Sequence, residues 1–198
     1  TLAENVPADK PFSAKLLDEQ IVVCRLGNEY AAFFDLCIHR GTPLSLGWIE
    51  GEEIICSYHG WSYNCDGICT KIPSIDSKNP IPKKARLTRY QAQERYGIIW
   101  VCMSDDPRSP IPELPALEDT NFHVTAKDER NWLCSAARAI ENFIDYAHFA
   151  WIHEGILGDR SRPEAPNVDV VREGVEIKFE FGNKPDGLHE IPHTNYYR

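Results

Sequence analysis

Two short stretches carry cysteine and histidine at spacings that suit metal binding. The first reads Cys37-Ile-His39, and the second, after a spacer of sixteen residues, reads Cys56-Ser-Tyr-His59. Two thiolates and two imidazoles can hold either one tetrahedral zinc ion or one cluster of two irons. Each stretch supplies one cysteine and one histidine, whereas zinc knuckles more often pair like ligands. We therefore expect a two-iron cluster, with both cysteines on one iron and both histidines on the other. Structural zinc is the alternative.

These stretches resemble the ligand loops of the Rieske [2Fe–2S] proteins. C-x-H-R-G from Cys37 and C-x-Y-H-G-W from Cys56 are similar to the oxygenase branch of that family. The respiratory branch has a further cysteine in each loop, and those two cysteines form a disulfide. Thr42 and Tyr58 stand at those places here, so the resemblance implies a cluster without the disulfide and a low potential, roughly −150 mV. Such a cluster passes electrons onward, and the chain should therefore contain an acceptor.

A second candidate site lies in a helix predicted over residues 136–153, which is rich in alanine and has apolar residues at helical spacing. The motif N-x2-D-x2-H-x4-H places Asn142, Asp145, His148 and His153 in this segment. Residues three apart share one side of a helix, so Asp145 and His148 are expected to be neighbours. The two histidines are five apart, and both reach one ion only if the helix ends or bends between them.

This motif resembles the mononuclear iron site of the Rieske non-haem iron oxygenases. The resemblance implies that His148 and His153 bind Fe(II), leaving room for O₂. It makes Asp145 a bridge that hydrogen-bonds an iron-ligand histidine and a cluster-ligand histidine of a neighbouring subunit. It places Asn142 close to the iron.

The family's third iron ligand, a carboxylate far beyond the histidine pair, has no match in this sequence. The nearby carboxylates do not stand at the expected position: Glu154, Asp159 and Glu190. The resemblance covers about the first half of a full-length subunit, so the catalytic domain is expected to be incomplete.

A proline-rich connector divides the chain into two parts. Four prolines fall between Pro107 and Pro115, which predicts a stiff, extended segment. We place the domains at 1–115 and 116–198. The predicted fold class is α+β: an N-terminal all-β Rieske [2Fe–2S] domain, followed by the beginning of an α+β catalytic domain that the resemblance implies is helix-grip-like. Strand pairs are predicted within residues 20–34, 46–56, 61–72, 86–103 and 168–181, and a further strand over 122–127.

Composition excludes some partners and favours one compartment. The 198 residues carry a net charge of −9, which argues against nucleic acid or an anionic membrane as a partner. We see no signal peptide, and the longest apolar stretch, Gly97–Met103, is too short to span a bilayer. The odd count of seven cysteines, two of them expected as metal ligands, favours a reducing cytoplasm.

The resemblance implies a terminal oxygenase that takes NAD(P)H-derived electrons from a ferredoxin, a ferredoxin reductase or both. The motif D-x2-H-F-x3-H-x-G-x-L-G from Asp145 looks most like the vanillate demethylase, phenoxybenzoate and carbazole oxygenase group, whose members are homotrimers. We expect O₂-dependent hydroxylation, dihydroxylation or oxidative demethylation of a small aromatic or related ring compound. One alternative is a Rieske-type ferredoxin electron carrier with an appended domain, which leaves residues 142–153 unexplained. Another is a zinc-stabilised binding module.

Overall fold

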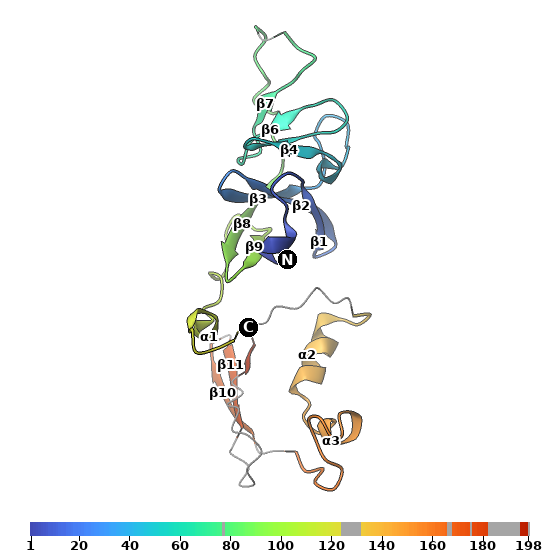
Figure 1. The fold of residues 1–198 in the computed structure, drawn as a ribbon, viewed down its shortest axis with the longest axis vertical. Coiled ribbons are helices and arrows are strands. Elements are labelled where there is room, and N and C mark those ends of the chain that lie inside the picture. Colours follow the sequence, from blue (N-terminus) through green and yellow to red (C-terminus); the bar gives the residue numbers. More distant parts are fainter. Residues whose placement is uncertain (77, 124–131, 166–167, 175, 182–194, 198) are drawn as a thin grey trace. The chain divides into compact units, whose positions relative to one another are not determined.

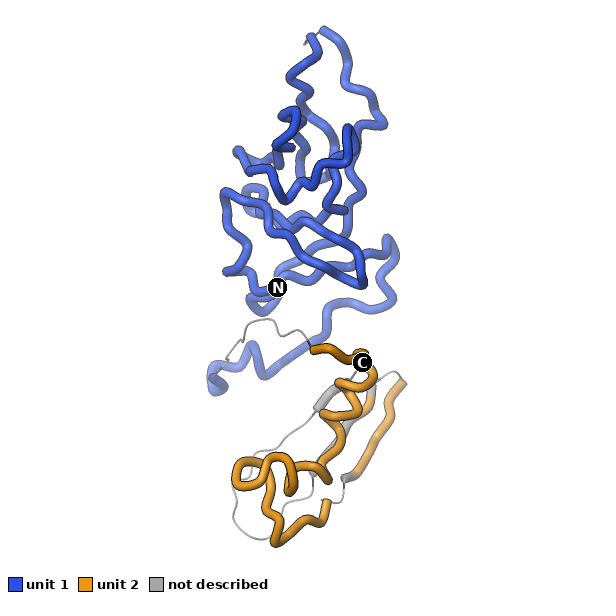
Figure 2. Tube along the Cα trace, turned by 90° about the vertical axis from the view of Figure 1, so that its right-hand side faces the viewer, with its two compact units in different colours: residues 1–129 blue, residues 130–198 orange. Residues whose placement is uncertain are grey.

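The computed structural model spans residues 1–198 and describes all of them except 77, 124–131, 166–167, 175, 182–194 and 198. The chain divides into two compact units, residues 1–129 and 130–198 (Figure 1 and Figure 2). Each unit has sheets of its own. The predicted boundary after residue 115 lies inside the first unit, and the predicted domain limits stay a prediction.

The first unit is built on two antiparallel sheets. One has five strands in the order β1-β2-β3-β8-β9, and the other has four in the order β4-β5-β6-β7. The prediction of a mostly antiparallel β domain is confirmed. The strands are β1 Phe12–Leu16, β2 Glu19–Leu26, β3 Glu29–Phe34, β4 Trp48–Glu50, β5 Glu53–Ile55, β6 Ser62–Tyr63, β7 Cys69–Lys71, β8 Arg89–Arg95 and β9 Ile98–Cys102, with 3₁₀ turns at Ala3–Asn5 and Leu44–Leu46 and a short helix α1 at Pro115–Glu118.

The β2–β3 hairpin forms the centre of the larger sheet. Its turn follows Leu26, which pairs with Glu29, and Gly27 has a φ of +63°, a conformation that costs glycine little because it has no Cβ. Successive residues of a strand point to opposite faces. Val22 and Val23 are both buried, and they belong to two different apolar clusters. The sheet is therefore covered on both faces, and one of these cores also contains the first candidate site.

The smaller sheet places the two cysteine–histidine stretches beside each other. The first stretch follows β3, and the second directly follows β5, where Cys56 comes after Ile55. Cys37 and Cys56 belong to the same buried cluster as Phe33 and Tyr63. The predicted hairpin around residues 46–56 is confirmed, although its first strand begins at Trp48. Two hairpins that share one core thus bring together residues far apart in sequence.

The second unit combines short helices with a three-stranded antiparallel sheet in the order β10-β11-β12. The hairpin predicted over residues 168–181 is confirmed. The strand predicted over 122–127, in the first unit, is not formed at Phe122 and His123, and its remainder lies outside the described residues. In the described part of the chain, no helix is long and apolar enough to cross a bilayer. The elements of the second unit are α2 Ala136–Ile144, α3 Phe149–Ile152, β10 Val168–Glu173, β11 Glu176–Phe181 and β12 Asn195–Tyr197.

The prediction of one continuous helix over residues 136–153 is wrong. Helix α2 begins at the N-cap Ser135, whose hydroxyl accepts the Arg138 N–H, and it ends before Asp145, whose backbone is extended at φ −87° and ψ 102°. The Asp145 carboxylate accepts the Ala147 N–H at 3.0 Å. This local bond between side chain and backbone competes with helix continuation. The chain becomes helical again only at Phe149, where α3 begins.

Two glycines of the β4–β5 hairpin test how tightly the smaller sheet is built. A Cβ at Gly47 would lie 2.0 Å from the carbonyl oxygen of Ile55, whereas a Cβ at Gly51 meets nothing within 4 Å although its φ is +64°. Gly47→Ala should therefore destabilise the fold by about 3 kcal/mol, because the backbone must move. Gly51→Ala should cost about 1 kcal/mol, the cost of its backbone conformation alone. Urea unfolding with unchanged m measures both, and equal midpoints would contradict this account.

Candidate functional site

The two loops that carry the cysteine–histidine stretches have the same backbone hydrogen bonds. In each loop the cysteine carbonyl accepts the N–H of the glycine four residues later, Gly41 to Cys37 and Gly60 to Cys56, both at 2.9 Å. In each, the cysteine N–H also donates to the carbonyl five residues later. Both glycines have positive φ, +71° and +68°, a region that suits glycine. The two loops are thus locally alike, although they come from different hairpins.

The four predicted ligands lie together as like pairs. The ring centroids of His39 and His59 are 4.5 Å apart. Burial raises the pKa of the Cys56 thiol, and a hydrogen bond and charge from Cys37 raise it further. Cysteine therefore lies beside cysteine and histidine beside histidine, the arrangement that a two-iron cluster requires. The ligand roles themselves stay a prediction.

The electrostatics of this pocket suit a metal centre. Cys37 and Cys56 are each 1% exposed. The Nδ1 atom of His39 is buried and has no hydrogen-bond partner among the described residues. Desolvation, followed by the charges of His59 and Arg40, lowers the pKa of His39. A neutral imidazole with a buried, unpartnered nitrogen lacks the compensation that buried polar atoms normally find. A metal bound at this nitrogen would supply it.

Two residues to which sequence reasoning gave no role contact the predicted ligands. The Tyr63 hydroxyl lies 3.2 Å from the sulfur of Cys37. Burial, then the neighbouring Cys37, raises the pKa of Tyr63, so its hydroxyl stays protonated and can donate to a thiolate. The Trp61 indole stacks on the His39 ring, with centroids 4.6 Å apart and planes 7° apart. The sequence does give one indication of these contacts, because both aromatic residues closely follow His59.

The segment after β7 closes over the second loop. A Cβ at Gly60 would lie 3.2 Å from the side chain of Pro73, so only glycine lets this proline approach without displacement. Ile72, directly before it, is buried in the same cluster as Cys56. This segment therefore packs against the loop that carries His59.

The second candidate site is built around the break between α2 and α3. His148 is the N-cap of α3 and His153 its C-cap, and their ring centroids are 5.3 Å apart. An Asp145 carboxylate oxygen lies 3.6 Å from Nδ1 of His148, slightly beyond hydrogen-bond range. Asn142 lies exposed on α2, one turn earlier. The two histidines thus cap opposite ends of the one-turn helix α3, and the break before α3 separates both of them from α2.

The loop after His153 packs directly against α3. A Cβ at Gly158 would lie 2.5 Å from the backbone nitrogen of Ala150. The Gly155 N–H donates to the Gly158 carbonyl at 2.8 Å. These close backbone contacts hold the end of α3, and with it His153, in place.

Among the residues that the structure describes, none stands at this site as a third metal ligand. Glu154 forms an ion pair with Arg160 at 2.9 Å, and the Asp159 carboxylate accepts hydrogen bonds from Ser161. Glu190 lies outside the described residues. Within the described ranges, no group of three or more His, Cys, Asp and Glu side chains is placed to hold a single metal ion. That includes the first unit, where the paired cysteines and paired histidines would share two irons instead of one.

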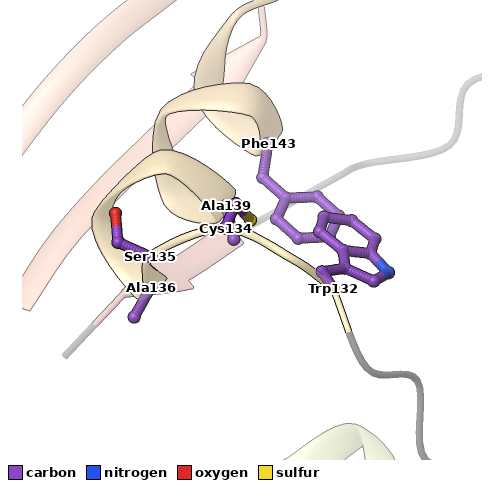
Figure 3. Close-up of a pocket in the computed structure, with 6 residues that line it drawn as sticks. All are labelled: Trp132, Cys134, Ser135, Ala136, Ala139 and Phe143. Atoms are coloured by element: carbon purple, nitrogen blue, oxygen red, sulfur yellow. The ribbon is translucent and has the colours of Figure 1, made fainter.

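A shallow hollow of about 340 Å³ lies at the beginning of α2 (Figure 3). The rings of Trp132 and Phe143 stack across it with centroids 5.5 Å apart. None of the predicted site residues lines it, so we assign it no part in either metal centre. Its lining consists of Trp132, Cys134, Ser135, Ala136, Ala139 and Phe143.

Each of the two parts of the chain matches a known domain family. Residues 1–91 match the Rieske [2Fe-2S] domain, and residues 132–190 match the vanillate O-demethylase oxygenase C-terminal domain. Methylxanthine N1-demethylase NdmA of Pseudomonas putida is 39% identical over 89% of this chain and 50% of its own length. Methylxanthine N3-demethylase NdmB of the same species is 33% identical over 95% and 54%.

Solved structures show the same relationship. The structure of Pseudomonas putida CBB5 NdmA superposes with a TM-score of 0.83 at 37% identity, covering 91% of this chain and 56% of that one. The chain therefore spans about half the length of the curated relatives it matches.

Proposed function

This chain belongs to the Rieske non-haem iron oxygenases, and from that premise we propose that it is the part of a terminal oxygenase α subunit that carries the cluster and two ligands of the catalytic iron. One observation carries the proposal. The chain presents paired cysteines and paired histidines in its first unit, and two further histidines beside a carboxylate in its second. The combination supplies a site for electron entry and a site for oxygen chemistry.

In the first unit, Cys37, Cys56, His39 and His59 would hold a [2Fe–2S] cluster, which transfers single electrons when bound. The buried, unpartnered Nδ1 of His39 supports this fit. The match of residues 1–91 to the Rieske domain favours the cluster over the zinc alternative. The protein's own contribution is to exclude water, to orient the rings and to donate the Tyr63 hydroxyl toward sulfur.

In the second unit, His148 and His153 would hold Fe(II), which supplies the activation of O₂ when bound. Asp145 is placed to orient the His148 ring, since carboxylate partners commonly fix the tautomer of a ligand histidine. Its other oxygen is held by the Ala147 N–H, which limits the motion of the carboxylate. Family resemblance extends this role to a bridge toward a cluster-ligand histidine of a neighbouring subunit. Asn142 would lie close to the iron.

We favour oxidative demethylation of a methylated aromatic or heteroaromatic ring over ring hydroxylation or dihydroxylation. NdmA and NdmB are named as methylxanthine N-demethylases, and the domain matched by residues 132–190 is named for vanillate O-demethylase. Electrons from NAD(P)H would arrive through a ferredoxin, a ferredoxin reductase or both, and the assembly would be a homotrimer. Seven cysteines without a disulfide among them support a cytoplasmic location.

A Rieske-type ferredoxin carrier with an appended domain is the competing function. A carrier needs its cluster domain alone, so it gives no reason for an oxygenase domain match over residues 132–190. It also gives no reason for the His148–His153 pair at the two ends of α3. The iron content of the protein distinguishes the two functions.

His148→Ala should remove iron without removing the cluster. After anaerobic reconstitution with Fe(II) and sulfide, the full-length oxygenase, which supplies the third ligand, should hold the cluster's iron and sulfide plus a further iron. The variant should lose only that further iron, because its imidazole ligand is gone, and should keep its visible absorption. His123→Ala, at an exposed histidine, is the control. Equal iron in all three proteins would favour the carrier, and zinc alone would exclude both functions.

Asp145→Asn should separate electron storage from turnover. In the full-length oxygenase, the variant should keep a reducible cluster while product formation falls about 10- to 100-fold, the usual cost of removing the partner of a ligand histidine. Formaldehyde release from caffeine as a methylated probe measures turnover. Glu141→Gln, at an exposed carboxylate paired with Arg138, should leave it unchanged. Turnover of Asp145→Asn at the parent rate would show that the assignment is wrong.

Tyr63→Phe should lower the reduction potential of the cluster. A hydrogen bond to thiolate sulfur stabilises the electron-rich reduced form more than the oxidised form. Its loss, at about 1 kcal/mol, corresponds to about 40 mV for a one-electron couple. Spectroelectrochemical titration measures the shift. Tyr58→Phe, which alters an exposed ring on His59, should change the potential little, and an unshifted Tyr63→Phe would mean that no such bond reaches the cluster.

A further inference from the structure

We propose that residues 71–76 and 78–86, here called the basic segment, form the docking surface for an acidic electron-transfer protein. The inference rests on the proposed function, because a donor is needed only if the first unit holds a cluster. It goes further by naming the surface on which the donor binds and the chemistry that recognises it.

The basic segment reverses the charge of the chain. It has five cationic residues against the single acid Asp76, a net charge of +4, whereas the whole chain carries −9, so that the remainder carries −13. No ion pair in the described part of the chain involves any of the five cations, and all five are exposed. Their charge is therefore available to a partner. The five residues are Lys71, Lys78, Lys83, Lys84 and Arg86.

The basic segment is anchored beside the cluster pocket. Its apolar residues Ile72 and Ala85 are buried in the cluster that contains Cys37 and Cys56, and Ile81 packs against that cluster. Ala85 also accepts a hydrogen bond at 2.9 Å from the first residue of β7. In Figure 1 the segment after β7 projects from the end of the smaller sheet. The buried apolar residues fix the segment to the domain, and the exposed cations therefore form a positively charged surface at a defined position.

The basic segment contacts the loop that carries His59. Pro73 belongs to the basic segment and lies against Gly60, the residue that follows His59. Arg40, which follows His39, adds a cation whose charge reaches that imidazole. A donor attracted to these cations would therefore be brought close to the pocket, where the path for electron transfer is short.

An acidic protein suits this surface better than other polyanions. Nucleic acids and anionic membranes present negative charge over an area much larger than the basic segment. They would therefore also approach the rest of the chain, whose net charge of −13 would repel them. Complexes of electron-transfer proteins are small and transient, and they depend on electrostatic steering. A compact acidic donor needs only this one patch.

The transfer itself is a one-electron exchange. The reduced donor would lose one electron and be oxidised, and the cluster that the paired cysteines and histidines of this chain would hold would gain that electron and be reduced. No bond is formed or broken. A plant-type [2Fe–2S] ferredoxin at about −400 mV is a suitable donor, because the step to an acceptor at roughly −150 mV is downhill.

The test compares two double variants with the same total charge. Lys83→Glu with Lys84→Glu alters the basic segment, and Lys10→Glu with Lys15→Glu makes the same change at exposed residues elsewhere in the first unit. The probe is a strongly acidic plant-type ferredoxin. Stopped-flow bleaching gives the rate at which the reduced probe reduces the cluster-loaded chain, and calorimetry gives the Kd of the oxidised probe.

At low salt, the Lys83/Lys84 variant should react about tenfold more slowly and bind about tenfold more weakly than the parent, while the Lys10/Lys15 variant changes less than about twofold. In 1 M NaCl, where the Debye length is about 3 Å, the three rates should converge. Equal loss in both variants, or a rate that does not fall with salt, would overturn the inference. If the cluster is present and dithionite reduces it, that result leaves the proposed function standing. A chain that holds no reducible cluster would overturn both.

Discussion

Everything in the first unit depends on holding two loops from different hairpins face to face. A cluster shared by two cysteines and two histidines tolerates little error in ligand position, so the backbone must define the loops before any metal binds. The structure does this twice with one device, a cysteine carbonyl that accepts the N–H of a positive-φ glycine. The core that buries Cys37 and Cys56 then fixes the loops relative to each other. Tyr63 and Trp61 complete the pocket by contacting one ligand from each pair.

The second unit solves a different geometrical problem. Two histidines five residues apart splay on a continuous helix, and here they flank the single turn of α3, His148 as its N-cap and His153 as its non-helical C-cap. A break at residues 145–148 separates α3 from α2. Asp145 produces the break with its own side chain, and the same carboxylate lies near His148. The residue that interrupts the helix is therefore also the one proposed to orient a metal ligand, so local structure and function depend on one side chain.

The sequence predicted what depends on short-range pattern. The β2–β3 hairpin follows from alternating apolar strands around Gly27, and the spacing of Cys37, His39, Cys56 and His59 was sufficient to single out four residues that the fold brings together. The break at Asp145 was missed because an alanine-rich apolar pattern continues through it, while one side-chain hydrogen bond decides against the helix. The Tyr63–Cys37 contact was missed for a different reason. It is a tertiary contact between positions 26 residues apart, and no spacing rule identifies such a pair. The anchoring that presents the basic segment likewise becomes visible only with the packing of Ile72 and Ala85.

The central claim is that paired cysteines and paired histidines in the first unit share one two-iron cluster. Pulsed electron paramagnetic resonance of the dithionite-reduced, reconstituted chain, prepared with ¹⁵N-labelled histidine, tests it most directly. The account predicts a reduced [2Fe–2S] signal with strong coupling to two histidine nitrogens, and loss of one coupling when a single ligand histidine is replaced by cysteine. A signal without nitrogen coupling, or a reconstituted chain without any paramagnetic reduced form, would contradict it.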